Sequence, residues 1–233
     1  MSGSAAALFD VDGTLVDTSY LHAVTWWEAL RQGGHVVPMA QAHRAVGLGT
    51  DQLLSRLLGE DRDRGQDGDL SSAHDALYAA YWPSLQPLPG AARLLRACAE
   101  RGWTVTLATS AKAPELKALR AALDVDDAIA AAVDADQVDA AKPAPDLVEQ
   151  ALRRSGATAA RAVFIGDTPW DVEAARRAGV PCIGVLSGGT GRAELQEAGA
   201  VEVYRDAADL ADHLDHSLLG SPDRLDGRRS EPA

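Results

Sequence analysis

The chain has 233 residues, of which 46% are hydrophobic and 24% charged, with a formal net charge of −12 at pH 7. This length accommodates one large domain or a core with a smaller insert, and the composition is ordinary for a globular protein. The acidic balance argues against a nucleic-acid partner, because binding to a phosphate backbone needs clustered Lys and Arg. With no membrane-spanning apolar stretch and no secretory signal at its start, we expect a cytoplasmic protein without a membrane partner.

The most informative stretch lies at the start of the chain. Residues 5–9 are continuously apolar, which is typical of a central parallel strand covered on both faces. Asp10 and Asp12 follow at the strand end, where ligands bind in open α/β sheets, and Gly13 permits a turn that approaches a ligand closely. Two neighbouring acids repel unless a cation binds or one is protonated. Either outcome suits phosphoryl chemistry, because Mg²⁺ prefers carboxylate oxygens and a protonated carboxyl can give its proton to a leaving oxygen. The alternative for this motif alone is a polar turn.

A helical insert is predicted directly after this strand. Its helices, in which no strand-like run occurs, are expected at 18–33, 38–46, 50–58 and 70–82. Asp17 or Thr18 is the expected N-cap of the first, and the charged stretch 60–69 is expected to be a solvated loop. The proline-rich stretch 83–90 marks the return to the core. We therefore predict a helical cap at 18–85 and a core built from 1–17 and 86–219.

From residue 91 onward, predicted helices and strands alternate. The helices are expected at 91–101, 114–123, 145–155, 172–178 and 192–198, and the strands at 103–108, 129–133, 162–165, 181–186 and 201–204. This alternation predicts an α/β fold, a doubly wound parallel sheet with the cap inserted into it. A last helix is expected at 207–219 and a disordered tail at 220–233. The two cysteines, Cys98 and Cys182, lack metal-ligand spacing and are predicted to be buried free thiols.

Reactive side chains also follow the later strands. Thr109 and Ser110 follow the second strand, Lys142 lies in a later loop, and Asp167 and Asp171 follow the strand at 162–165. Each has an ordinary alternative, as a helix cap or a surface lysine. Because the carboxyl ends of parallel strands share one edge of the sheet, we expect these side chains to meet near Asp10.

Together these motifs resemble those of the haloacid dehalogenase-like hydrolase superfamily. The similarity is to the phosphatase branch with a helical cap after the first strand, the group of phosphoglycolate phosphatase and β-phosphoglucomutase, and it extends to about residue 215. The matching positions are residues 10–14 for the first motif, Thr109 for the second, Lys142 for the third, and Asp167 with Asp171 for the fourth.

The resemblance implies a role for each matching residue. Asp10 would attack phosphorus to give an aspartyl-phosphate, and Asp12 would protonate the leaving alcohol and then deprotonate the attacking water. Thr109, Ser110 and Lys142 would bind the transferring phosphoryl group. Mg²⁺ would be held by Asp10, the backbone carbonyl of Asp12, Asp167 and, directly or through water, Asp171. The implied substrate is a small phosphorylated metabolite, and both a monomer and a homodimer are compatible with the sequence.

The first motif narrows the chemistry further. Asp12 argues against a dehalogenase and against phosphonate hydrolysis, and Thr14 fits a phosphatase better than a sugar phosphomutase. A mutase would nevertheless share every core motif, and a phospho-acceptor signalling domain would also use an acidic pocket. The signalling domain, however, has no need of a helical lid. Phosphate-ester hydrolysis is therefore our prediction.

Two cap residues are candidates for contacting the substrate. His22 lies just inside the first cap helix, where an ordinary surface histidine is an equal alternative. Arg44 precedes a glycine-bearing turn, although arginines are more often exposed. In related mutases this turn carries cations for a second phosphate, whereas here Val46 and Thr50 fill the corresponding places.

Overall fold

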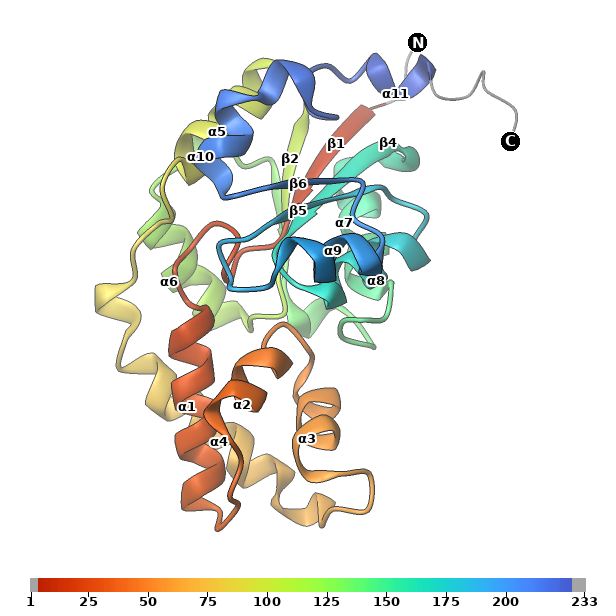
Figure 1. Ribbon diagram of the computed structural model, residues 1–233. Helices are drawn as coiled ribbons and strands as arrows, with labels where there is room; N and C mark the ends of the chain where they lie inside the picture. Colours follow the sequence, from red (N-terminus) through yellow and green to blue (C-terminus); the bar gives the residue numbers. More distant parts are fainter. Residues whose placement is uncertain (1–3, 228–233) are drawn as a thin grey trace.

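The computed structural model describes residues 4–227, which are built around a six-stranded sheet in the order β3-β2-β1-β4-β5-β6 (Figure 1). The strands are β1 (Ser4–Phe9), β2 (Thr104–Ala108), β3 (Ala131–Val133), β4 (Ala157–Gly166), β5 (Cys182–Val185) and β6 (Glu202–Tyr204). All neighbouring strands pair in parallel. The predicted doubly wound parallel sheet, with the first strand at its centre, is confirmed.

The helices fall into two groups along the chain. The insert between β1 and the rest of the core contains α1 (Ser19–Gln32), α2 (Met39–Ala45), α3 (Thr50–Leu58) and α4 (Asp67–Ala79). The remaining helices are α5 (Ala91–Glu100), α6 (Ala113–Leu123), α7 (Asp146–Ser155), α8 (Pro169–Arg177), α9 (Arg192–Ala198), α10 (Ala207–Asp212) and α11 (Arg224–Gly227). In the described part of the chain no helix is long and apolar enough to cross a membrane.

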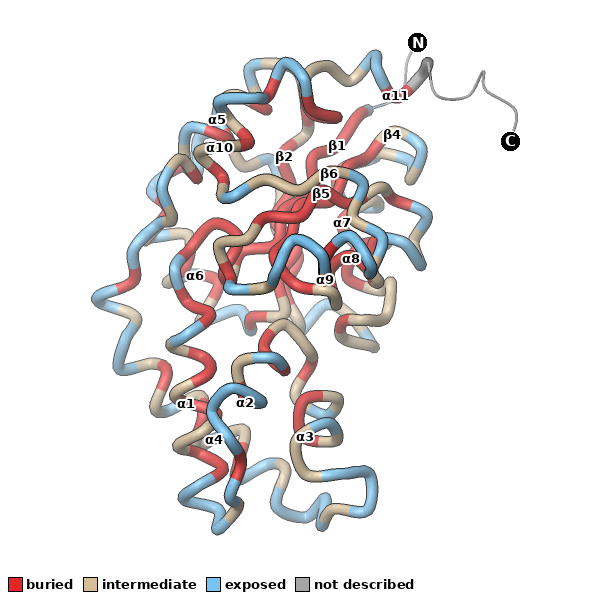
Figure 2. The backbone as a smooth tube through the Cα atoms, viewed as in Figure 1, coloured by how far each residue is buried: buried red, intermediate tan, exposed pale blue. Residues whose placement is uncertain are grey.

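The central strand is buried on both faces because its side chains alternate between two cores. Ala5, Ala7 and Phe9 face a cluster that includes apolar side chains of α5, α6 and α10. Ala6 and Leu8 face a second cluster formed with α7, α8 and α9. Figure 2 shows the resulting buried strands between more exposed helices. Cys98 and Cys182 lie buried in these two clusters as free thiols, as predicted.

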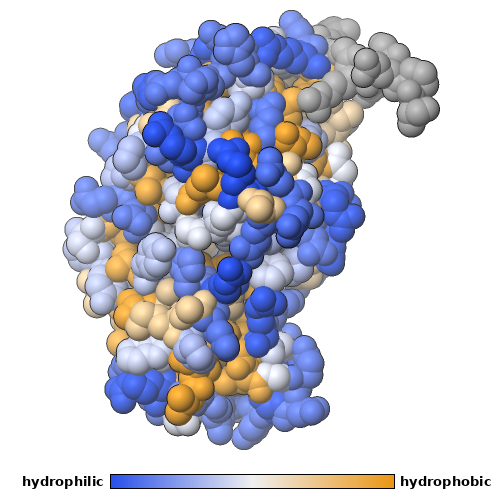
Figure 3. Space-filling model, in the orientation of Figure 1, coloured by the Kyte–Doolittle hydropathy of each residue, from blue (hydrophilic) through white to orange (hydrophobic). Residues whose placement is uncertain are grey.

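Helices α1–α4 form a bundle with a core of its own, below the sheet in Figure 1. Its buried apolar side chains are Trp26, Leu30, Val37, Ala45, Leu53, Leu54 and Leu70. Polar side chains cover most of the visible face of the molecule, and apolar ones gather at its lower end, over this bundle (Figure 3). We propose that the bundle is a separate cap domain with boundaries near residues 18 and 85.

The charged stretch 60–69 is more ordered than the predicted solvated loop. A short 3-10 turn spans Arg64–Gln66, and α4 begins already at Asp67. The guanidinium of Arg62, whose side chain is only 3% exposed, lies 2.7 Å from Asp51 and 2.8 Å from Asp67. This buried arginine links α3 to α4. The sequence did not indicate the link, because a stretch rich in charged residues is typical of a solvated loop.

The C-terminal part also differs from the prediction. The helix expected at 207–219 ends at Asp212 and is followed by a 3-10 turn at Leu214–His216. The tail expected to be disordered from residue 220 contains α11, because Leu225 is buried against the core and Arg224 donates to the carbonyl of Ser217 at 3.1 Å. The rest of that predicted tail, residues 228–233, lies outside the described residues.

Candidate active site

The strand register brings the predicted motifs to one edge of the sheet. Phe9 lies opposite Leu107 of β2 and Ile165 of β4, so the residues that follow these three strands emerge at the same level. The backbone N–H of Asp10 donates to the carbonyl of Ile165 at 2.9 Å, which fixes the start of the loop after β1.

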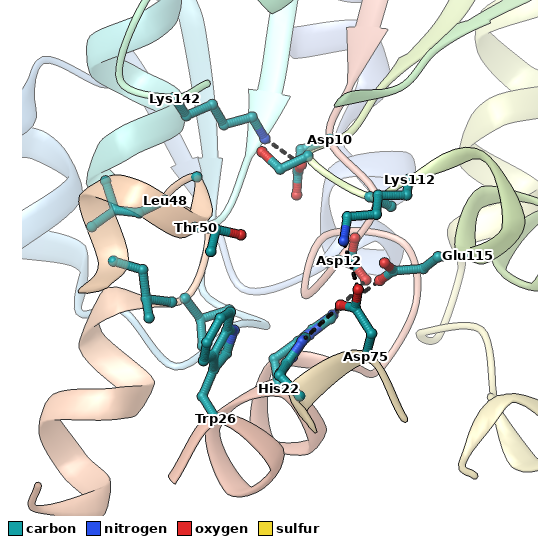
Figure 4. Close-up of a pocket in the computed structure, with 17 residues that line it drawn as sticks. Asp10, Asp12, His22, Trp26, Leu48, Thr50, Asp75, Lys112, Glu115 and Lys142 are labelled. Atoms are coloured by element: carbon teal, nitrogen blue, oxygen red, sulfur yellow. Dashed lines mark hydrogen bonds and ion pairs between the residues drawn. The ribbon is translucent and has the colours of Figure 1, made fainter. Parts of the chain in front are cut away.

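Lys142 is fully buried between two carboxylates at this edge. Its Nζ lies 2.5 Å from Oδ1 of Asp10, a contact seen in Figure 4. The same nitrogen lies 2.6 Å from Oδ1 of Asp171. Burial raises the pKa of Asp10 to about 7, with repulsion from Asp171 and Asp12 added to it and the charge of Lys142 opposing it. Burial lowers the pKa of Lys142, but its two carboxylate partners outweigh burial and hold the pKa above its usual value.

Asp167 completes a buried group of three carboxylates. Oxygen atoms of Asp10, Asp167 and Asp171 lie within 4.8 Å of one another. Burial raises the pKa of Asp167 well above its usual value, and the charges of Asp10 and Asp171 add to this effect. Three carboxylates with one lysine hold excess negative charge, and hard oxygen donors are the ligands that Mg²⁺ prefers. These residues therefore fit a divalent cation.

Two other groups fix the carboxylates of this cluster. The hydroxyl of Thr14 donates to Oδ1 of Asp167 at 2.9 Å. Oδ2 of Asp171 accepts hydrogen bonds from the backbone N–H and the hydroxyl of Thr168, at 3.0 and 2.6 Å, in the capping box of α8. Asp171 thus combines the capping role that the sequence allowed with a place in the carboxylate cluster.

Glycines permit the close packing around Asp167. Gly13 has φ +77°, and a Cβ there would collide with Ser19 and Asp167. Gly188 approaches from the other side, and a Cβ at this position would overlap the carboxylate of Asp167. Both turns therefore require glycine.

Asp12 points away from the carboxylate cluster toward the cap. Its Oδ1 accepts from the hydroxyl of Thr18 at 2.8 Å and lies 3.3 Å from Nε2 of His22, while Oδ2 accepts from Thr109 at 3.1 Å. Burial raises the pKa of Asp12, but these hydrogen bonds and the charge of His22 outweigh it and hold the pKa below its usual value. Thr18 is the N-cap residue of α1, as predicted, yet its hydroxyl serves Asp12 rather than the helix.

His22 lies between two carboxylates. Its Nε2 is 3.3 Å from Asp12 and 3.4 Å from Oε1 of Glu115. Burial lowers the pKa of His22, but hydrogen bonding to Asp12 and the charges of Asp12 and Glu115 outweigh it and raise the pKa. The structure therefore places His22, which the sequence suggested as a substrate contact, beside Asp12 in the same pocket.

Asp10 and Asp12 line a pocket of about 90 Å³ that lies between cap and core. The cap contributes apolar side chains, the hydroxyl of Thr50 and the polar residues His22, His74 and Asp75. The core contributes Ser110 and, as Figure 4 shows, Lys112 and Lys142. The hydroxyl of Ser110 is buried and has no hydrogen-bond partner among the described residues. It is therefore available to a ligand.

Arg44 does not line this pocket. Its guanidinium lies 2.8 Å from Glu194 of α9. Arg44 borders a different cavity, which is also lined by residues 188–191. The neighbouring His43 donates to the carbonyl of Gly188 at 2.9 Å, with its ring stacked on that of Tyr20. These contacts join the cap to the core outside the Asp10 pocket.

Four further polar residues of the pocket were not singled out from the sequence: His74, Asp75, Lys112 and Glu115. His74 lies in α4, 52 residues after its partner His22, and no motif marks it. Burial and the charge of Asp12 raise the pKa of Glu115 to about 7. Lys112 and Glu115 follow Ser110 closely in the sequence. Their nearness to a predicted site residue is the signal that could have identified them.

Comparison with known proteins settles the family. The family model of haloacid dehalogenase-like hydrolases matches residues 5–179. The chain is a haloacid dehalogenase-like hydrolase. A phosphoglycolate phosphatase from Rhodospirillum rubrum is 33% identical to it over 234 residues, which cover 94% of each chain.

Solved structures agree with this membership. A hydrolase from Pseudomonas syringae is 35% identical to this hydrolase, with a TM-score of 0.86 over 91% of this chain and 99% of the other. CbbY from Rhodobacter sphaeroides in complex with xylulose-1,5-bisphosphate is 25% identical, with a TM-score of 0.72 over 89% and 96%. This haloacid dehalogenase-like hydrolase is thus a phosphoric monoester hydrolase, and the alternative of a phospho-acceptor signalling domain is dropped.

Proposed function

We propose that the protein is a Mg²⁺-dependent phosphatase that hydrolyses a small phosphate monoester through an aspartyl-phosphate. The observation that carries this proposal is the arrangement at the end of β1. Asp10 is paired there with buried Lys142, and Asp12, two residues on, faces the cap and His22.

In the first step an oxygen of Asp10 attacks phosphorus, and the bond from phosphorus to the leaving oxygen breaks. Lys142 compensates negative charge beside the nucleophile, and Thr109 and the unpartnered hydroxyl of Ser110 bind phosphoryl oxygens. Mg²⁺ bound by Asp10, Asp167, the carbonyl of Asp12 and, directly or through water, Asp171 would neutralise charge on the phosphoryl group. Positioning and electrostatics then supply most of the rate.

Asp12 handles the protons in both steps. It rests as a carboxylate beside the imidazolium of His22, so the proton for the leaving alkoxide passes from His22 to Asp12 and from Asp12 to oxygen. In the second step water attacks phosphorus, the bond from phosphorus to Asp10 breaks and inorganic phosphate leaves. Asp12 accepts the proton of the water and returns it to His22. Asp10 is thereby regenerated.

The pocket favours a small leaving group, because cap side chains close it to about 90 Å³. We propose 2-phosphoglycolate as the first substrate to test, since a relative that is 33% identical carries the name phosphoglycolate phosphatase. A cap that excludes water around the phosphoryl group suits either a phosphatase or a mutase.

The second candidate is a sugar phosphomutase, which the likeness to a CbbY bound to a sugar bisphosphate keeps in consideration. A mutase must retain a second phosphate, and a buried phosphate needs a positive partner. Val46 and Thr50 provide none, Arg44 is engaged by Glu194 outside the pocket, and the pocket residue Lys112 is paired with Asp75. These contacts favour release of the product and hydrolysis of the aspartyl-phosphate.

A panel of phosphate monoesters with Mg²⁺ tests the proposal. The monoesters are 2-phosphoglycolate, 4-nitrophenyl phosphate and glucose 1-phosphate, the last with glucose 1,6-bisphosphate. Acetyl phosphate is added as an acyl phosphate. We expect stoichiometric inorganic phosphate from at least one alkyl monoester. Efficient formation of glucose 6-phosphate without matching phosphate release would establish the mutase instead.

A further inference from the structure

A chain of hydrogen-bonding groups runs from Asp12 through the cap to the rim of the pocket. Nε2 of His22 faces Asp12 at 3.3 Å, and its Nδ1 lies 3.3 Å from Nε2 of His74. Nδ1 of His74 lies 3.3 Å from Oδ1 of Asp75, whose Oδ2 accepts from Lys112 at 2.6 Å. The labelled members of this chain are seen in Figure 4.

The two imidazole rings are held rigidly. His22 and His74 are both buried, and His22 stacks on Tyr78 with 4.1 Å between ring centroids. His74 stacks in turn on Trp26 at 4.2 Å. Rings packed in this way keep their nitrogen atoms aligned with their partners.

The chain has one consistent arrangement of protons. Burial, the largest effect, lowers the pKa of His74 to about 4, so this ring is neutral and has a single N–H. Asp75 is an acceptor for an N–H on Nδ1, which leaves Nε2 of His74 as an acceptor. His22 then donates from Nδ1 to His74, and its other N–H points at Asp12. If His74 instead carried its proton on Nε2, its N–H would point at the N–H of His22, and this series of hydrogen bonds could not form.

We propose that His74 is a positioning residue for the proposed phosphatase reaction: by accepting a hydrogen bond from His22, it holds the other N–H of His22 on Asp12. The inference rests on the proposed role of Asp12 as the proton donor to the leaving oxygen. His22, His74 and Asp75 belong to the cap, whereas Asp12 and Lys112 belong to the core. This support for Asp12 therefore exists only while cap and core are packed together.

The test compares leaving groups of different basicity. An alkoxide must receive a proton as it leaves, whereas acetate from acetyl phosphate needs none. Loss of positioning at Asp12 should therefore slow the alkyl monoester that the panel finds to be hydrolysed best and spare acetyl phosphate. A defect in folding or in binding of the phosphoryl group would slow both substrates alike.

We expect His74→Leu to lower kcat/KM for the alkyl monoester by about tenfold and that for acetyl phosphate by no more than about twofold. His74→Gln should restore most of the loss, because its amide oxygen accepts from His22. Asp75→Ala, at a half-exposed position where folding is not at risk, should give a smaller loss of the same selectivity. His35→Leu, which changes a cap histidine away from the pocket, is the matched control and should change neither substrate.

Asp12→Asn separates this inference from the proposed function. If Asp12→Asn lowers kcat/KM, which does not include hydrolysis of the aspartyl-phosphate, by the same factor for both substrates, the proton-donor role proposed for Asp12 is wrong. If Asp12→Asn slows mainly the alkyl monoester, the proposed function stands. If His74→Leu and Asp75→Ala then slow both substrates alike or neither, the role of His74 is wrong.

Discussion

At the end of β1, the two neighbouring acids Asp10 and Asp12 have different surroundings. Asp10 faces Lys142 and two other carboxylates, whereas Asp12, two residues away, faces hydroxyls and an imidazole. The pKa of the first is raised and that of the second is lowered. These different environments suit the two neighbouring acids to the separate roles that we propose for them.

The first prediction concerns the proposed nucleophile. Asp10→Asn should lower kcat by more than about a hundredfold, because an amide is nearly isosteric with the carboxylate but a poor nucleophile. Phosphate release measures the loss, and circular dichroism checks that the fold is retained. Turnover near the parent rate would contradict the covalent mechanism.

The second prediction concerns the glycine beside Asp167. A Cβ at Gly188 would overlap the Asp167 carboxylate, whereas a Cβ at Gly191 would meet open space. Gly188→Ala should therefore raise the Mg²⁺ concentration needed for half-maximal activity by about tenfold or more, which corresponds to about 1.4 kcal/mol of binding free energy. Gly191→Ala is the matched control. Equal Mg²⁺ requirements in the two variants would exclude the packing argument.

At the scale of elements, two exposed ion pairs join the cap to the core. Arg44 pairs with Glu194 of α9, and Asp75 of α4 pairs with Lys112 before α6. All four side chains are substantially exposed, so each pair contributes only about 0–1 kcal/mol. These two exposed pairs therefore add little to the packing of the cap on the core, in contrast to the buried contacts of His22 with Asp12 and Glu115.

The third prediction tests the substrate role that the sequence suggested for Arg44. Because its guanidinium faces Glu194 outside the Asp10 pocket, Arg44→Met should change KM for the best monoester by less than about threefold. Glu194→Gln should have a similarly small effect. Steady-state kinetics measures both. An increase in KM of tenfold or more, confined to Arg44→Met, would return this residue to the binding site.

The elements themselves were largely predictable, because their signals are local. Alternating apolar strands and helices predicted the doubly wound parallel sheet with a central first strand, and strand ends carried the acidic motifs. The pairing of Arg62 with Asp51 and Asp67, by contrast, depends on how α3 and α4 pack. The same holds for His74, whose partner comes from α1. Contacts between distant residues are set by tertiary packing, which local patterns do not encode.

At the scale of the whole molecule, the sheet concentrates negative charge at its functional edge. Asp10, Asp167 and Asp171 are buried there with a single lysine, in a chain with a net charge of −12. The raised pKa of Asp167 means that ionising this group costs stability in the folded protein. A bound cation would offset that cost.

The fourth prediction follows from this balance. Mg²⁺ at about 100 times its dissociation constant should stabilise the fold by about 2.7 kcal/mol and raise Tm. Asp167→Asn should raise Tm in EDTA, because it removes a buried charge while its amide oxygen still accepts from Thr14, and it should abolish the response to Mg²⁺. Thermal unfolding by circular dichroism measures both effects. An unchanged Mg²⁺ response in the variant would remove Asp167 from the metal site.

The last prediction concerns the pH dependence of stability and the buried His74. Its pKa is about 4 in the folded protein against 6.5 for an ordinary histidine, so between these values the unfolded chain binds a proton that the folded protein does not. The free energy of unfolding therefore falls as the pH drops through this window, by about 1.4 kcal/mol per unit. His74→Gln has no such group, so its loss of stability between pH 7 and pH 5 should be smaller than that of the parent by about 2 kcal/mol. Urea unfolding at the two pH values measures the difference, with His35→Gln as the control that should behave like the parent. Equal losses in His74→Gln and the parent would show that His74 is already protonated in the folded protein, which would also break the order of protons from Asp75 to Asp12.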